Sequence, residues 1–119
     1  MSFVFDTYAL IEIIEGKPAY KKYVDLPVFI NNLTYYEFYY LILRDRENQV
    51  TKILNLFNFN FLEIKKEHIH DAAKFRLKNK EKKLSFPDCL GYIMAEENKM
   101  KFLTGDKEFE NFDNVEFVK

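Results

Sequence analysis

The sequence predicts an α/β fold with a largely parallel sheet. Two observations support this prediction: several short apolar segments have the composition of buried strands, and amphipathic segments at helical spacing lie between them. The chain has 119 residues, with 13 phenylalanines and 8 tyrosines but only three glycines and three prolines. We therefore expect residues 1–119 to form one domain with an aromatic core and no long linkers.

Strand and helix signals alternate along the chain. Strands are predicted at residues 3–5, 27–30, 59–64, 101–104 and 115–118. Helices are predicted at residues 8–15, 18–23, 33–56, 67–83 and 86–98. Gly16 ends the first helix, Asn31 and Asn32 are expected to form a turn, and the long helical region should break near residues 45–48.

The helix predicted at residues 67–83 has one apolar and one charged face. The apolar positions at helical spacing are Ile69, Ala72, Ala73 and Leu77. We expect this face to pack against the rest of the protein. His68 and His70 are two residues apart and do not share a helix face, so both are expected at or near the surface, without bound zinc.

Composition limits the possible functions. The net charge of -1 and the pI near 6.1 provide no general basic surface for nucleic acid, so any such binding must depend on local charge. Cys89 is the single cysteine, which excludes an intramolecular disulfide, and we expect it to be buried. Asp6 and Glu12 interrupt the first apolar segment too early for a signal peptide, and no segment approaches the roughly 20 apolar residues of a membrane span. A cytoplasmic protein without membrane contact is expected.

Four acidic residues map to one edge of the predicted sheet. Asp6 directly follows the first strand, and Asp106 follows the fourth. Glu37 lies near the start of the helix after the second strand, and Asp88 opens the helix that leads into the fourth strand. Ligand sites in open α/β sheets form outside the carboxyl ends of the strands, where these four residues fall.

Each acid also has a purely structural interpretation. Thr34 and Glu37 have the spacing of a capping box, and Ser85 and Asp88 nearly repeat it. The two aspartates that follow strands could cap the short segments after them. Capping does not, however, require four acids at one edge, where their charges repel one another. A divalent cation such as Mg²⁺ or Mn²⁺ removes that repulsion, so the pattern indicates a metal-dependent site for phosphoryl transfer.

Four segments that contain these acids resemble the successive signatures of the PIN domain family. They are FVFDTYALIE, NLTYYEFYY, FPDCLGYIMA and FLTGDKEF, and the likeness is strongest to small VapC-like ribonuclease toxins. The third segment departs from the family at Cys89, Leu90 and Tyr92, where small residues are usual. The resemblance implies a three-layer α/β/α sandwich with a parallel five-stranded sheet in the order 3-2-1-4-5.

The resemblance also implies roles for individual residues. It implies catalysis by Asp6, Glu37, Asp88 and Asp106, with Mg²⁺ or Mn²⁺ held by the three aspartates. Supporting hydroxyl positions fall at Thr7, Thr34 and Thr104. The implied activity is endoribonuclease cleavage of RNA that leaves a 5′ phosphate, and the implied partners are a small antitoxin protein and a second copy of the chain. A PIN-like module that binds RNA or protein without catalysis is the alternative.

The sequence indicates less clearly which residues contact the substrate than which residues form the catalytic site. The segment RLKNKEKK offers five basic residues that could contact RNA phosphates or simply form a solvated helix end: Arg76, Lys78, Lys80, Lys82 and Lys83. Four tyrosines flank Glu37 and could stack on bases, enter the core or form a protein interface: Tyr35, Tyr36, Tyr39 and Tyr40.

Overall fold

Five parallel strands form the centre of the computed structural model, which describes every residue from Met1 to Lys119. They are β1 (Phe3–Phe5), β2 (Pro27–Ile30), β3 (Asn58–Phe61), β4 (Lys101–Thr104) and β5 (Val115–Phe117). Their order in the sheet is β3-β2-β1-β4-β5, and every neighbouring pair is parallel. This confirms the predicted fold class and strand order.

Helices follow the strands as the sequence predicts. They are α1 (Thr7–Ile14), α2 (Asn32–Asp45), α3 (Val50–Leu54), α4 (Lys66–Lys78) and α5 (Phe86–Glu97), with 3₁₀ turns at Pro18–Tyr23, Glu47–Gln49 and Lys107–Phe109. Gly16 adopts φ +73° just after α1, and the long helical region breaks after Asp45, both as predicted. None of the helices has the length and apolar character needed to span a membrane.

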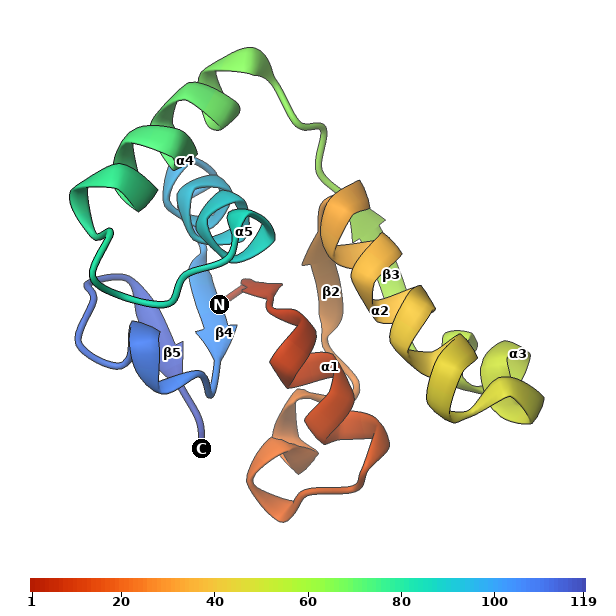
Figure 1. The fold of residues 1–119 in the computed structure, drawn as a ribbon. Coiled ribbons are helices and arrows are strands. Elements are labelled where there is room, and N and C mark those ends of the chain that lie inside the picture. Colours follow the sequence, from red (N-terminus) through yellow and green to blue (C-terminus); the bar gives the residue numbers. More distant parts are fainter.

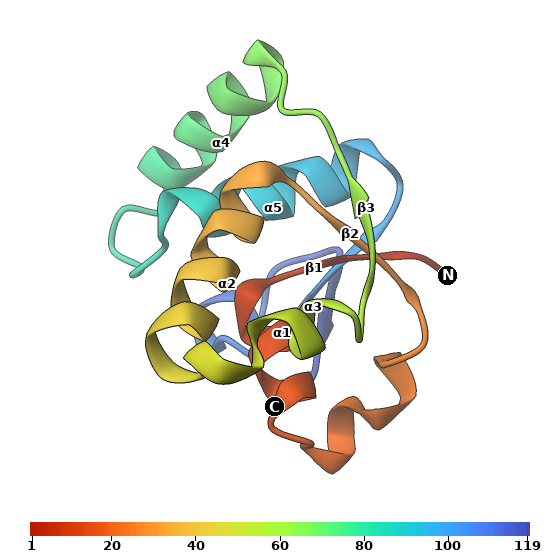
Figure 2. The ribbon, with the colours of Figure 1, turned by 90° about the vertical axis from the view of Figure 1, so that its right-hand side faces the viewer.

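Two apolar cores lie on opposite faces of the sheet, because alternate strand residues point to opposite sides. Phe3 and Phe5 pack with α1, α2 and α3, whereas Val4 between them packs with α4 and α5. In the same way Leu103 belongs to the first core and Phe102 to the second. Figures 1 and 2 show α4 beside α5 and α2 beside α1, in separate layers.

The buried face of α4 differs from the predicted one. Its inward side carries His68 and Ala72, whereas Ile69 is 41% exposed and Leu77 is 70% exposed. The backbone N–H of Lys65, at the N-cap position, donates to Nδ1 of His68 at 2.9 Å. Ala72 is buried as the predicted apolar face requires, but Ile69, Ala73 and Leu77 of that face are exposed, and His68, which was expected at or near the surface, is buried.

Cys89 is buried and unpaired, as predicted, and burial raises the pKa of its thiol to about 11. Tyr92, one helical turn further on, stacks on Phe75 with ring centroids 4.9 Å apart. Its hydroxyl donates to the carbonyl oxygen of Asp113 at 2.6 Å. The bulky residues of α5 are thus accommodated by an aromatic cluster that surrounds them.

Candidate active site

Asp6 is held at the carboxyl end of β1 by two contacts with β4. Its backbone N–H donates to the carbonyl oxygen of Leu103 at 3.0 Å, which extends the pairing of the two strands. Its Oδ2 accepts from the Thr104 hydroxyl at 2.6 Å. Asp6 occupies the N-cap position of α1, but its side chain forms no capping hydrogen bond. Its carboxylate is therefore oriented by the neighbouring strand and not by the helix. Asp6 as a whole is only 5% exposed.

Glu37 is oriented by a second threonine. The Thr7 hydroxyl, at the start of α1, donates to Glu37 Oε1 at 2.6 Å and so joins α1 to α2. The capping box predicted for Thr34 and Glu37 is absent, because α2 begins earlier in the chain and Glu37 lies in its second turn. Thr34 is buried within the first turn and does not line the site.

Asp88 and Asp106 occupy helix starts, as predicted. Ser85 caps α5 by accepting from the backbone N–H of Asp88 at 3.2 Å, which leaves the Asp88 carboxylate outside the cap. Asp106 accepts from the backbone N–H of Glu108 through Oδ1. One oxygen of this carboxylate therefore caps the 3₁₀ turn that follows it. Between β4 and Asp106, a side chain at Gly105 would collide with the Tyr8 ring and the carbonyl oxygen of Val118.

The four predicted acids line one hollow of about 440 Å³ at the carboxyl edge of the sheet. Thr7 lines it too, together with Glu12 of α1 and Glu15 at the end of that helix, which the sequence analysis did not assign to a site. Their signal was their spacing from Tyr8, since residues 8, 12 and 15 share one helix face. No three acidic, histidine or cysteine side chains come close enough together to form a complete cation site.

The charge in this hollow is uncompensated. Burial raises the pKa of Asp6 well above its usual value, and the nearby charges of Asp88 and Glu37 raise it further, against the hydrogen bond from Thr104. No basic side chain lines the hollow. Hard carboxylate oxygens around a buried anion suit Mg²⁺ or Mn²⁺, and Mg²⁺ needs only one or two carboxylates because it keeps several waters. The residues present therefore fit such a cation.

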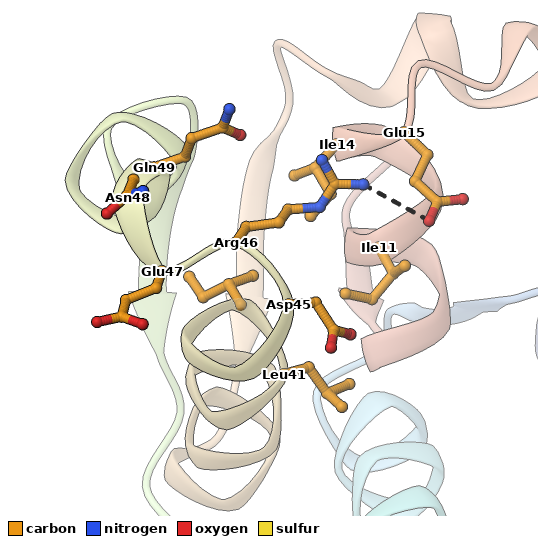
Figure 3. Close-up of a pocket in the computed structure, with 10 residues that line it drawn as sticks. Ile11, Ile14, Glu15, Leu41, Asp45, Arg46, Glu47, Asn48 and Gln49 are labelled. Atoms are coloured by element: carbon orange, nitrogen blue, oxygen red, sulfur yellow. Dashed lines mark ion pairs between the residues drawn. The ribbon is translucent and has the colours of Figure 1, made fainter.

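A second hollow, of about 550 Å³, continues along α1 and α2 and shares Ile11, Glu15 and Leu41 with the first. Figure 3 shows Arg46 pointing across it towards Glu15, and the two form an ion pair of 3.7 Å. Arg46 is the only basic residue that lines either hollow. Together the two hollows form an acidic groove with an aliphatic floor.

Four of the five predicted basic residues surround a further hollow of about 490 Å³: Arg76, Lys80, Lys82 and Lys83. Lys78 does not line it. Arg76 donates to the carbonyl oxygen of Leu84 at 3.0 Å, so it also holds the loop after α4.

The tyrosines of α2 fall into two groups, because Tyr35 packs edge-on against Phe59 and Phe61, whereas Tyr36 and Tyr40 remain exposed.

A profile of the PIN domain matches residues 3–115, nearly the whole chain. The chain belongs to the PIN domain family. No curated protein sequence matches it. The strand order β3-β2-β1-β4-β5 is thus that of a PIN domain.

Solved structures of PIN domain proteins share the fold. A toxin–antitoxin complex from Klebsiella pneumoniae aligns with a TM-score of 0.75 and 24% identity over 96% of this chain and 95% of that one. VapBC2 from Rickettsia felis, bound to a DNA fragment from its promoter, aligns with a TM-score of 0.78 and 16% sequence identity over all of both chains. VapC20 from Mycobacterium tuberculosis, a toxin that cleaves the sarcin-ricin loop, aligns with a TM-score of 0.78 and 15% sequence identity. The alignment covers 99% of this chain and 100% of that one.

Asn31 is the positioning residue that the sequence analysis missed. It is not part of a turn but the N-cap of α2, and its Oδ1 accepts from the backbone N–H groups of Leu33 and Thr34 at 2.9 Å. Its amide also donates to the sulfur of Met94 at 3.6 Å across the sheet edge. An asparagine directly after a strand and before a helical pattern was the available signal.

Proposed function

We propose that this PIN domain, residues 1–119, is a metal-dependent endoribonuclease that cleaves RNA phosphodiester bonds. The observation that carries the proposal is the convergence of Asp6, Glu37, Asp88 and Asp106 on one hollow, with Asp6 buried among like charges. Structural carboxylates are normally paired with cations, whereas these face one another. A site that concentrates negative charge at a cost in stability is typical of cation-dependent phosphoryl transfer.

Asp6, Asp88 and Asp106 would hold one or two Mg²⁺ or Mn²⁺ ions. When bound, such an ion stabilises the charge that develops on the phosphoryl oxygens and activates a water molecule. Glu37 would be a further ligand or would orient that water, since the Thr7 hydroxyl holds one of its oxygens and leaves the other free to accept a proton. Thr104 favours the ionised, metal-binding form of Asp6 by donating to it, against the burial and the like charges that raise its pKa.

Variants of Asp6 provide the direct test. The Asp6→Asn variant keeps the shape of the side chain and its capacity to accept from Thr104, but it loses the charge that a cation needs. We expect wild-type protein to cleave RNA only with Mg²⁺ or Mn²⁺, and the variant to lose that activity while its circular dichroism spectrum is unchanged. Cleavage by the folded variant at the wild-type rate would refute the assignment.

A role as the toxin of a toxin–antitoxin pair in the cytoplasm extends the proposal. Two of the structural relatives are toxin–antitoxin assemblies. The groove along α1 and α2 supports a basic antitoxin segment as partner, because acids surround an aliphatic floor that includes Ile11 and Leu41. A second copy of the chain is a further proposed partner, supported by the exposed apolar residues of α4.

The alternative function is binding of RNA or protein without catalysis. The separation of the acids favours it, because no three of them form a complete cation site. Thermal denaturation with increasing Mn²⁺ distinguishes the two functions, since a ligand that binds only the folded state must raise the melting temperature. A rise for the wild type but not for Asp6→Asn supports the nuclease, and no rise at millimolar Mn²⁺ supports the binding module.

A further inference from the structure

An exposed aromatic hollow lies directly beside the acidic site. It has a volume of about 440 Å³ and is lined by Leu33, Tyr36, Glu37, Tyr40, Phe86 and Pro87. The residues from α2 have the spacing i, i+3, i+4 and i+7 and so form one stripe of the helix. The first turn of α5 forms the opposite wall. Tyr36 is 71% exposed and Tyr40 is 53% exposed, although both rings are large and apolar.

Core packing does not explain these two rings. Their neighbour Tyr35 turns towards β3, where it contacts Phe59 and Phe61, and the Tyr39 ring lies beside that of Tyr35. Tyr36 and Tyr40 make no aromatic contact, and only the Arg44 guanidinium approaches the Tyr40 ring, at 5.9 Å. Leaving two aromatic faces in water sacrifices the free energy that burial would contribute, so an exposed cluster of this kind indicates a binding surface.

The aromatic hollow connects the acidic site to the basic segment. Glu37 lines both the acidic and the aromatic hollow, and Phe86 lines both the aromatic and the basic hollow. The three hollows therefore adjoin in a fixed order: the acidic one with the carboxylates, the aromatic one with the tyrosine rings, and the basic one with Lys80, Lys82 and Lys83. Lys80 forms no ion pair with the protein, whereas the Lys82 ammonium lies 5.4 Å from the Phe112 ring.

We propose that Tyr36, Tyr40 and Phe86 form a subsite that stacks on the base of a nucleotide beside the scissile phosphate, and that Lys80 contacts the phosphate beyond it. This proposal rests on the nuclease activity proposed above and adds the binding of the substrate to it. An unpaired polynucleotide alternates phosphates with flat apolar rings, which matches the order of the three hollows. A base within a duplex has no free face for such stacking.

Binding of a short fluorescent oligoadenylate, measured by anisotropy in EDTA at low ionic strength, tests the subsite without any cleavage. An oligomer of the same length that lacks the bases serves as the reference for phosphate binding alone. We expect Tyr36→Ala and Tyr40→Ala each to weaken binding of oligoadenylate by about fivefold or more, and to leave the abasic oligomer unaffected. Tyr36→Phe should keep wild-type affinity, because stacking needs the ring and not the hydroxyl.

Lys80→Ala should weaken both oligomers alike and reduce the dependence of binding on salt. Leu43→Ala is the matched control, since Leu43 is an exposed apolar residue of the same helix, 42% exposed, outside the three hollows. Unchanged oligoadenylate binding by both tyrosine variants would overturn the subsite, as would an equal loss for the abasic oligomer.

The same variants distinguish a nucleotide subsite from a protein interface, and the subsite from the nuclease activity. If they change self-association in sedimentation but not oligoadenylate binding, the hollow belongs to a protein interface and the proposal fails. If the wild type cleaves RNA while the tyrosine variants bind and cleave normally, the subsite fails and the nuclease remains. If the tyrosines govern oligoadenylate binding but no metal supports cleavage, the subsite remains and the nuclease fails.

Discussion

Two threonine hydroxyls determine how the acidic side chains of this protein are presented. Thr7 donates to Glu37 and Thr104 donates to Asp6, each at 2.6 Å. Thr104 also accepts from the backbone N–H of Asp106 at 3.0 Å, so one hydroxyl connects two acids of the site. Removing that hydroxyl leaves a buried carboxylate without its donor, which is more costly than the loss of an exposed hydrogen bond.

We therefore predict that Thr104→Val lowers the free energy of unfolding by about 1–3 kcal/mol at neutral pH and weakens metal binding. Valine has nearly the shape of threonine but no hydroxyl, so the loss reports the hydrogen bonds and not packing. Thr104→Ser keeps the hydroxyl and should retain most of the metal affinity. Urea denaturation and Mn²⁺ titration measure the two effects, and a valine variant with wild-type metal affinity would contradict the prediction.

The acidic site should also cost stability when no metal is bound. Because the pKa of Asp6 is higher in the folded than in the unfolded chain, the folded state holds its proton more tightly. The stability contribution of Asp6 is therefore most favourable below the unfolded pKa and is lost as the pH rises through the folded pKa. The charged form of Asp6 is therefore destabilising in the folded protein, by about 1.4 kcal/mol for each pH unit between the two pKa values once the pH exceeds both.

Asp6→Asn should accordingly raise the melting temperature of the metal-free protein at pH 7, by roughly 3–6 °C for each kcal/mol gained. Calorimetry in EDTA at pH 7 and near pH 4 measures the effect, which should shrink at the lower pH as the wild-type carboxyl becomes protonated. A variant that melts below the wild type at pH 7 would show that the carboxylate stabilises the fold without metal.

At the scale of elements, the sequence was most informative where local chemistry decides the structure. The apolar run before Asp6 and the pair Ser85 and Asp88 identified a strand end and a helix start correctly. The helix predicted from residue 33 begins at Asn32, but its cap was predicted wrongly, because Thr34 offers a plausible cap while Asn31 makes the actual one. Both positions satisfy the capping rules, but it is Asn31 that accepts from the first backbone N–H groups of the helix, and its amide also contacts Met94.

The cap of α2 should matter for function as well as stability, since α2 carries Glu37. We predict that Asn31→Ala lowers the free energy of unfolding by about 1 kcal/mol and reduces nuclease activity, because two backbone N–H groups lose their acceptor. Asn31→Asp should preserve the cap. The adjacent Asn32 is exposed, so Asn32→Ala is a matched control that should change little. Equal effects of the two alanine variants would contradict the assignment.

At the scale of the whole molecule, the sequence could not show which face of α4 would be covered. Ile69, Ala72, Ala73 and Leu77 satisfy a helical apolar pattern, yet of these the fold buries only Ala72, together with His68. Periodicity identifies an apolar stripe without saying what covers it. The same limit applies to the hollows beside the acids, which depend on how α2 and α5 pack against each other.

The exposed stripe of α4 leads to a prediction about assembly. In a twofold dimer the same helix meets its copy, so one residue contributes twice to the interface. We predict a homodimer in sedimentation equilibrium that Leu77→Lys dissociates, because the substitution places two like charges at the centre of an apolar contact. Leu56 is similarly exposed, at 52% against 70% for Leu77, and lies outside α4, so Leu56→Lys should leave the dimer intact. A wild-type protein that sediments as a monomer at micromolar concentration would overturn the assignment of this stripe to a dimer interface.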